Sequence, residues 1–166
     1  MTLGLSLLSG TLLAMVLHEF GHAIAARLCN VKTSEFGFGV GRRVYRLQVG
    51  SMSLSLRAWP LGSFVMLDGD ALRQRSPAQQ SFVHLGGVLI NLLAGALFFG
   101  TNLGWLNLLL AVGNLLPLYQ HDGWKCGMVI VRTLLKRKSQ PAEWAFTFSG
   151  GFVSLVFAWL VIRVFV

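Results

Sequence analysis

The sequence has few charged residues and very few acids. Only 12% of its 166 residues are Asp, Glu, Lys or Arg, about half of the roughly 25% that is typical of soluble domains. Hydrophobic residues make up 54% of the chain, and the mean hydropathy is +0.64. This composition excludes a disordered chain, a coiled coil and most soluble enzymes. It indicates a small integral membrane protein with room for about four spanning helices of roughly 20 residues each.

Cysteine is also scarce. The two cysteines, Cys29 and Cys126, lack the spacing of a metal-binding or redox pair. Both lie in parts of the chain that we assign to the cytoplasmic side, where thiols stay reduced. The sequence therefore predicts two unpaired cysteines.

The basic residues are clustered, and they give the chain a net charge of +8. Eight of the 14 Lys and Arg lie between Arg27 and Arg75, and five lie between Lys125 and Lys138. The apolar stretches between these clusters carry almost none, which is the pattern of the positive-inside rule. We therefore interpret both clusters as cytoplasmic loops of a multi-pass protein, and we expect no nucleic-acid partner.

The apolar stretches that are candidates for membrane spans are residues 3–28, 82–100, 105–119 and 144–166. The first stretch lacks the basic start and the small-residue cleavage site of a signal peptide, so we expect a retained helix. The predicted fold class is a mainly α, polytopic membrane protein. It has about four spanning helices and a small β-hairpin or sheet between spans one and two.

The expected hairpin rests on a period of two in the sequence. Apolar and polar residues alternate over 51–58, which favours a strand, and 44–49 is its predicted partner across a turn at Gly50. We expect Pro60 and Gly62 to end the second strand. An exposed edge of the strand at 51–58 would accept an extended peptide of almost any sequence, because the pairing uses backbone groups.

The run His18-Glu19-Phe20-Gly21-His22 is an HExxH sequence inside the first apolar stretch. Two His residues four positions apart share one helix face, so both imidazoles can bind one Zn²⁺. Glu19 lies about 100° round the helix from His18, where it can reach a metal-bound water and act as general base. Ionisable groups within a span are costly and usually functional. We therefore expect a metal ion here, although a His pair satisfied within a helix bundle is the structural alternative.

A hydrolytic zinc site needs a third protein ligand and one open position. Among the six acids of the chain, Asp122 lies at the end of the third apolar stretch, on the same side of the membrane as His22. We predict Asp122 as the third ligand. His121 and Cys126 are the alternatives, because both are residue types that bind zinc.

Four motifs together resemble those of the site-2 protease family, the intramembrane zinc metalloproteases. In chain order they are the HExxH sequence, Pro60-Leu-Gly-Ser-Phe-Val65, Gly86-Gly-Val-Leu-Ile-Asn91 and Asn114-Leu-Leu-Pro-Leu-Tyr-Gln-His-Asp122-Gly123. The chain departs from the family pattern where Ser, Phe and Gly stand in place of Gly, Tyr and Pro, at Ser63, Phe64 and Gly87. Trp124 stands where many members have a second Gly. None of these departures removes a predicted zinc ligand.

The resemblance implies a ligand set and a catalytic residue. One Zn²⁺ per chain would be held by His18, His22 and Asp122, and Glu19 would be catalytic. Asn91 and Asn114 would position the substrate or stabilise the oxyanion, and hydrogen bonding between helices is the alternative for both. His84 is expected to be an interfacial or helix-capping residue.

The resemblance also implies the organisation and function of the chain. Residues 1–135 would be a minimal core without a PDZ or CBS domain, and an additional span at 143–166 would complete a single domain, 1–166. The expected function is that of a zinc-dependent endopeptidase that cleaves transmembrane segments of single-pass or otherwise membrane-anchored proteins within the lipid bilayer. We expect a prokaryotic cell membrane, an active site open toward the cytoplasm, and control by regulatory membrane proteins.

Two other classes of function remain open at this stage. A catalytically silent zinc-binding scaffold would hold client proteins without cutting them, and replacing Glu19 would then have no effect in the cell. A metal-ion carrier would need polar ligands on several spans along a path, whereas this sequence gathers its candidate ligands at one depth.

Overall fold

The computed structural model describes residues 3–135 and 140–165. Lys136, Arg137 and Lys138 of the second basic cluster, and the last residue of the fourth apolar stretch, lie outside this range. The elements are, in chain order, α1 (Leu3–Leu28), β1 (Thr33–Val49), β2 (Met52–Leu67), α2 (Gly69–Arg73), α3 (Pro77–Leu97), α4 (Asn102–Leu115), α5 (Asp122–Leu134) and α6 (Gln140–Phe165). The mainly helical class and the hairpin between the first two long helices are therefore confirmed.

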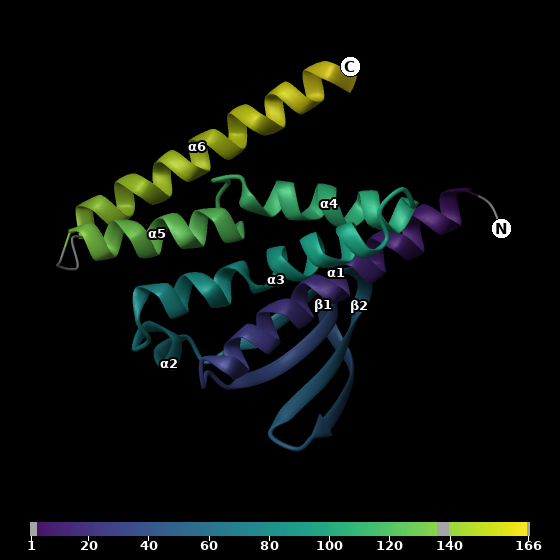
Figure 1. Ribbon diagram of the computed structural model, residues 1–166, viewed down its shortest axis with the longest axis horizontal. Helices are drawn as coiled ribbons and strands as arrows, with labels where there is room; N and C mark the ends of the chain where they lie inside the picture. The colour runs from purple at the N-terminus through teal and green to yellow at the C-terminus, as the bar shows by residue number, and fades with distance from the viewer. Residues whose placement is uncertain (1–2, 136–139, 166) are drawn as a thin grey trace.

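The expected count of about four spans is not confirmed. Among the described residues, three helices (α1, α3 and α6) are long and apolar enough to cross a membrane. The helix α4 has 14 residues, or about 21 Å at 1.5 Å per residue, which is less than the roughly 30 Å of a hydrocarbon core. It stops because Leu116 is extended, with ψ 143°, the conformation that a following proline favours. The stretch at 105–119 is thus not one helix, and α5 continues in a similar direction after the break (Figure 1).

The helices α1 and α3 pack closely in the centre of the molecule (Figure 1). At their crossing Gly21 faces Gly86, and a Cβ atom built on Gly86 would lie 2.5 Å from the carbonyl oxygen of Gly21. Small residues allow helix backbones to approach in this way within membranes. The start of α3 is fixed by a capping box between Ser76 and Gln79, which satisfies otherwise unpaired backbone N–H groups.

We expect the substitution Gly86→Ala to force α1 and α3 apart and to lower the midpoint of thermal unfolding. The new Cβ would meet the backbone of Gly21 and the Cβ of Ala25 at 2.5 and 2.8 Å, and such overpacking typically costs about 1–3 kcal/mol. Gly151→Ala in α6 is the matched control, because no atom lies within 4 Å of its added Cβ. Equal unfolding midpoints of the two variants in detergent would show that the close crossing of α1 and α3 contributes nothing to the stability of the fold.

The strands form one bent hairpin that extends further than the sequence suggests. The turn lies at Gly50, with φ +59°, as predicted. However, β2 continues through Pro60 and Gly62 to Leu67, so the expectation that these residues end the strand is wrong. Gly62 adopts φ +86°, which lets the strand bend there without leaving the sheet.

Because of the bend, the hairpin pairs with itself more than once. Residues 35–38 pair on one side with 63–66 and on the other side with 53–56, and residues 53–56 pair in addition with 45–48. The segment 51–58 is therefore internal, which corrects the expectation that it offers a free edge. In the described part of the chain, the segment 63–67 has a strand partner on one side only.

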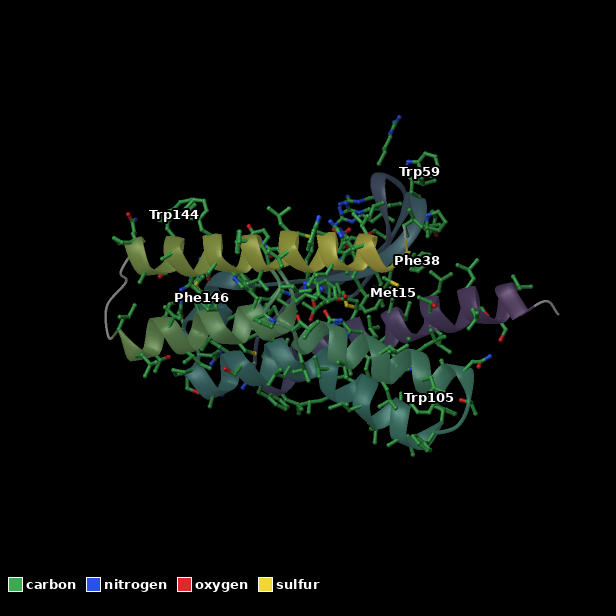
Figure 2. The ribbon with its side chains drawn as sticks, turned by 90° about the horizontal axis from the view of Figure 1, so that it is seen from above. Met15, Phe38, Trp59, Trp105, Trp144 and Phe146 are labelled. Carbon is green, nitrogen blue, oxygen red and sulfur yellow. The ribbon has the colours of Figure 1, made fainter. Side chains whose placement is uncertain are left out.

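The hairpin and α6 lie on opposite sides of the central helices (Figure 1). The ring of Phe20 on α1 packs against Phe36 of β1, with 4.8 Å between the centroids. On the other side, the ring of Phe146 points from α6 toward α5 and stacks on Trp124, whereas Trp144 points away from α5 (Figure 2). These contacts place the hairpin directly beside the helix that carries the HExxH sequence.

Candidate metal centre

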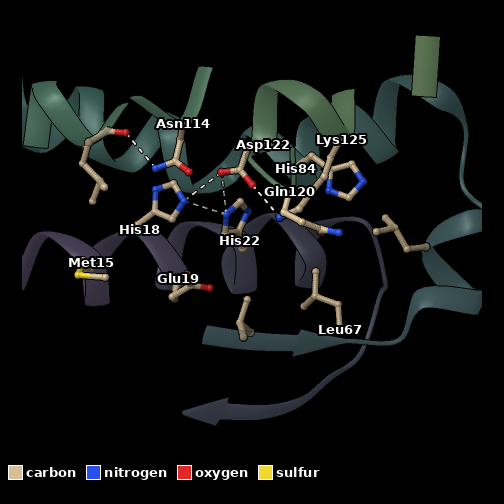
Figure 3. A pocket seen from close by; sticks show the side chains of 13 residues that line it. Met15, His18, Glu19, His22, Leu67, His84, Asn114, Gln120, Asp122 and Lys125 are labelled. Carbon is tan, nitrogen blue, oxygen red and sulfur yellow. Dashed lines mark hydrogen bonds and ion pairs between the residues drawn. The ribbon is translucent and has the colours of Figure 1, made fainter. Parts of the chain in front are cut away.

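The residues of the HExxH sequence face different neighbours, as their spacing on a helix requires. His18 and His22 are both buried and face α3 and α5, while Phe20 faces the hairpin. Gly21 contacts α3 through its close approach to Gly86. Glu19 is half-buried and lines a cavity next to the two imidazoles (Figure 3). This short segment of α1 thus contacts the candidate metal site, the crossing with α3 and the hairpin at the same time.

Asp122 reaches this site as the first residue of α5, after the break that follows α4. Its side chain is only 3% exposed, and its Oδ2 lies 3.0 Å from Nε2 of His18 and 3.2 Å from Nε2 of His22 (Figure 3). The next residue must be glycine, because a Cβ on Gly123 would overlap the carbonyl oxygen of Leu115. The Asp-Gly pair therefore lets the start of α5 pack directly against the end of α4.

The outer nitrogens of both imidazoles are held by oxygen atoms of α3. Nδ1 of His18 lies 2.6 Å from Oδ1 of Asn91, and Nδ1 of His22 lies 2.9 Å from the carbonyl oxygen of Val83. Because both partners are acceptors, each Nδ1 carries the proton, and each Nε2 presents a lone pair. This tautomer is the one that ligates a metal through Nε2.

The inner atoms have the spacing of a metal site. Nε2 of His18 and Nε2 of His22 are 3.2 Å apart, and ligands at 2.0–2.1 Å from a tetrahedral zinc ion stand about 3.3 Å apart. Oδ2 of Asp122 is buried without a hydrogen-bond donor. Three buried lone pairs that converge repel one another unless a cation lies between them. The residues present therefore fit zinc, and among the described residues no other group of His, Cys, Asp and Glu gathers in this way.

A cavity of about 520 Å³ opens beside these three residues. Its polar lining includes Glu19, His84, Asn114, Gln120 and Lys125 (Figure 3). Nζ of Lys125 donates to Oδ1 of Asp122 at 3.1 Å, so the second carboxylate oxygen is occupied and Oδ2 remains for a metal. The cavity is thus large enough for a piece of peptide and polar where a reaction would take place.

The remaining candidate residues have distinct positions. Asn114 lines the cavity and donates to the carbonyl oxygen of Leu110 in its own helix, whereas Asn91 is fully buried and bonded to His18. His121 and Cys126, the alternative third ligands, do not belong to the cluster. Cys126 instead points its thiol at the carbonyl oxygen of Ser81, 3.7 Å away.

Sequence reasoning did not assign His84 and Lys125 to this site. Both lie on the cavity wall, and a signal for each was present. His84 precedes Asn91 by seven residues, which places both on one face of α3. Lys125 follows Asp122 by three residues, the spacing at which side chains on a helix meet.

Two imidazoles from HExxH, one carboxylate and an adjacent glutamate are the ligand set and general base of zinc peptidases. Here they lie on helices, and three helices of the described residues are candidate spans, which indicates a multi-pass membrane protein. The sequence matches the family model described as Peptidase family M50 over residues 7–102. Because this match covers more than half of the chain, the protein belongs to that family.

Individual relatives agree with this assignment. A candidate zinc metalloprotease of Clostridium acetobutylicum is 30% identical over an alignment 93 residues long, which covers 51% of this chain and 27% of the relative. One from Helicobacter pylori is 32% identical over 97 residues, 49% of this chain and 28% of the relative. The chloroplastic membrane metalloprotease ARASP of Arabidopsis thaliana is 32% identical over 91 residues, 48% of this chain and 20% of the relative. The matched region is thus only about a quarter of the length of these curated relatives.

Proposed function

We propose that this protein is a zinc-dependent intramembrane endopeptidase that cleaves transmembrane segments of membrane-anchored proteins. The observation that carries the proposal is the convergence of His18, His22 and Asp122 at 3.0–3.2 Å on one side of a cavity that Glu19 also lines. One zinc ion per chain satisfies this ligand set and leaves a fourth position open toward the cavity. The names of the relatives support zinc as the metal.

A zinc ion held there would supply Lewis acidity for the attack of water on a peptide bond. Glu19 would take the proton from the attacking water and deliver it to the departing amine. Asn91 and the carbonyl of Val83 keep both imidazoles in the ligating tautomer. Lys125 holds the other oxygen of Asp122, which fixes the direction of the carboxylate during the reaction. Asn114, which lines the cavity, would donate to the substrate backbone.

The edge at 63–67 is our candidate for the substrate-binding strand. Its outer side has no strand partner among the described residues, and Val65 and Leu67 line the same cavity as Glu19. A transmembrane helix satisfies its backbone hydrogen bonds internally, so it must unwind before a peptide bond can reach the site. Pairing of the unwound segment with this edge would replace the lost hydrogen bonds. We therefore expect cleavage near helix-breaking residues.

We further propose that the cavity is reached from the cytoplasm of a prokaryotic cell. The C-terminal end of α1, the start of α3 and the end of α5 lie at one end of the molecule (Figure 1). Arg27, Arg75 and Arg132 belong to these segments or to the loops beside them, and positive residues favour the cytoplasmic side. Regulatory membrane proteins would bring substrates to this end or withhold them.

The proposal is tested by reconstituting the chain in liposomes with a single-pass substrate that has a glycine-proline pair in its span. We expect cleavage within the span, loss of cleavage after treatment with 1,10-phenanthroline, and recovery after addition of zinc. A soluble protein of the same charge serves as control and should stay intact. Cleavage that persists in the metal-stripped protein would overturn the proposal.

A further inference from the structure

Asn107 is a polar residue that none of the four motifs contains. It lies in the middle of the apolar helix α4 and has no exposed surface. A buried amide without partners costs several kcal/mol in an apolar environment. Its complete burial in a mostly apolar helix therefore calls for a specific set of hydrogen bonds.

The amide of Asn107 is the far end of a chain of hydrogen bonds that leads to His18. Its Nδ2 donates to the carbonyl oxygen of Leu103 at 2.8 Å, which leaves Oδ1 as an acceptor. That oxygen accepts from Nδ2 of Asn91 at 2.6 Å, and the second N–H of Asn91 is donated to the carbonyl oxygen of Ala14 at 3.1 Å. Oδ1 of Asn91 then accepts from Nδ1 of His18 at 2.6 Å. Three helices thus contribute to one network.

We infer that Asn107 is a positioning residue that fixes the amide of Asn91 and, through it, the metal-binding tautomer of His18. An amide turned by 180° would direct its NH₂ group at Nδ1 of His18. His18 would then carry its proton on Nε2, which faces Asp122 and is the atom needed for a metal. The acceptor oxygen of Asn107 prevents this turn, because both N–H groups of Asn91 then have partners on the side away from His18. Residues that orient a ligand in this way typically change metal affinity 10- to 100-fold when they are removed.

This inference rests on the proposed metal site, and its test separates the two. The variant Asn107→Leu keeps the approximate volume and removes the acceptor, whereas Asn107→Asp keeps an oxygen at the same place. Asn102→Leu, at the exposed start of the same helix, is the matched control. Zinc affinity is measured in detergent by competition with a chromophoric chelator. We expect Asn107→Leu to bind zinc about 10- to 100-fold more weakly, and both Asn107→Asp and Asn102→Leu to remain near the wild type.

A second measurement needs no metal. In ¹⁵N spectra of the histidine-labelled, metal-free protein, Nδ1 of His18 should carry a proton in the wild type, whether or not Nε2 beside Asp122 also binds one. In Asn107→Leu, a mixture of tautomers should appear, in which part of the molecules lack the proton on Nδ1. A purely structural role would lower the unfolding midpoint without changing the tautomer. Unchanged tautomer and unchanged zinc affinity in Asn107→Leu would overturn the inference and leave the proposed function intact.

Failure of the proposed function can also be distinguished from failure of the inference on Asn107. A wild-type protein that binds no zinc would contradict the proposed function, while the tautomer of His18 would still decide the role of Asn107. If Asn107→Leu does not fold, Asn107→Ala gives the same two readings, because it also lacks the acceptor and adds no volume. The expected results for Asn107→Ala are the same weaker zinc binding and the same mixed tautomer.

Discussion

The variant Glu19→Gln is expected to lose peptide-bond cleavage while it retains its zinc. Glutamine has the same shape as glutamate but cannot accept a proton, and removal of a general base typically lowers the rate about 10²- to 10⁴-fold. Glu19 lines the cavity beside His18 and His22 but is not part of the ligand cluster. The change should therefore affect the chemical step alone. Cleavage of a reconstituted single-pass substrate and the zinc content of the purified protein are the two quantities to measure.

A matched control distinguishes loss of the base from general damage. Glu143→Gln removes a carboxylate that pairs with Arg132 where α5 and α6 meet, outside the cavity lining, and its cleavage rate should match the wild type. If the protein were instead a catalytically silent scaffold, Glu19→Gln would have no effect in the cell, because binding of client proteins does not need a general base. A Glu19→Gln variant that cuts as fast as the wild type would contradict our assignment of the catalytic residue.

The variant Asp122→Ala is expected to lose zinc as well as activity. It removes one of three protein ligands and leaves only His18 and His22, which sit on a single helix turn. Loss of a residue that merely orients a ligand weakens binding about 10- to 100-fold, so loss of the ligand itself should exceed about 100-fold. Wild-type protein should contain about one zinc per chain by elemental analysis, and the variant much less.

The control for this experiment is another aspartate. Asp70→Ala removes an exposed carboxylate that pairs with Arg73 on α2, and its zinc content should equal that of the wild type. Full zinc occupancy in Asp122→Ala would mean that a residue other than Asp122 is the third zinc ligand. Cys126 and His121 would then be replaced in turn, because both lie within four residues of Asp122 along the chain.

The fold follows from the sequence where the signals are local. The apolar run at 3–28 is one helix with those bounds, and Gly50 forms the predicted turn. The errors arise where neighbouring segments decide the outcome. The strand continues past Pro60 because residues 63–66 pair with residues 35–38. The sequence of 60–67 by itself contains no signal that predicts this pairing. The break at Leu116, in contrast, has a local cause, because the following Pro117 favours an extended backbone there.

The site shows the same division. The spacing of His18 and His22 on one helix determines by itself that their imidazoles share a face. The alternation of apolar stretches and basic loops placed Asp122 on the same side of the membrane as His22, which was enough to select it from six acids as the predicted third ligand. Neither pattern revealed that Asn91 holds His18, or that Asn107 holds Asn91.

The sequence by itself therefore determined which functional residues each segment carries and which segments are apolar enough for a membrane. These residues are the metal-binding His pair with its glutamate and the aspartate of the Asp-Gly pair. Only the tertiary structure decided which helices meet, and at what depth. The reason is that helix spacing fixes directions along one segment, whereas contact between segments depends on how closely their backbones approach. Here that approach is set by Gly21 against Gly86 and by Gly123 against Leu115, and it brings the three ligands within reach of one ion.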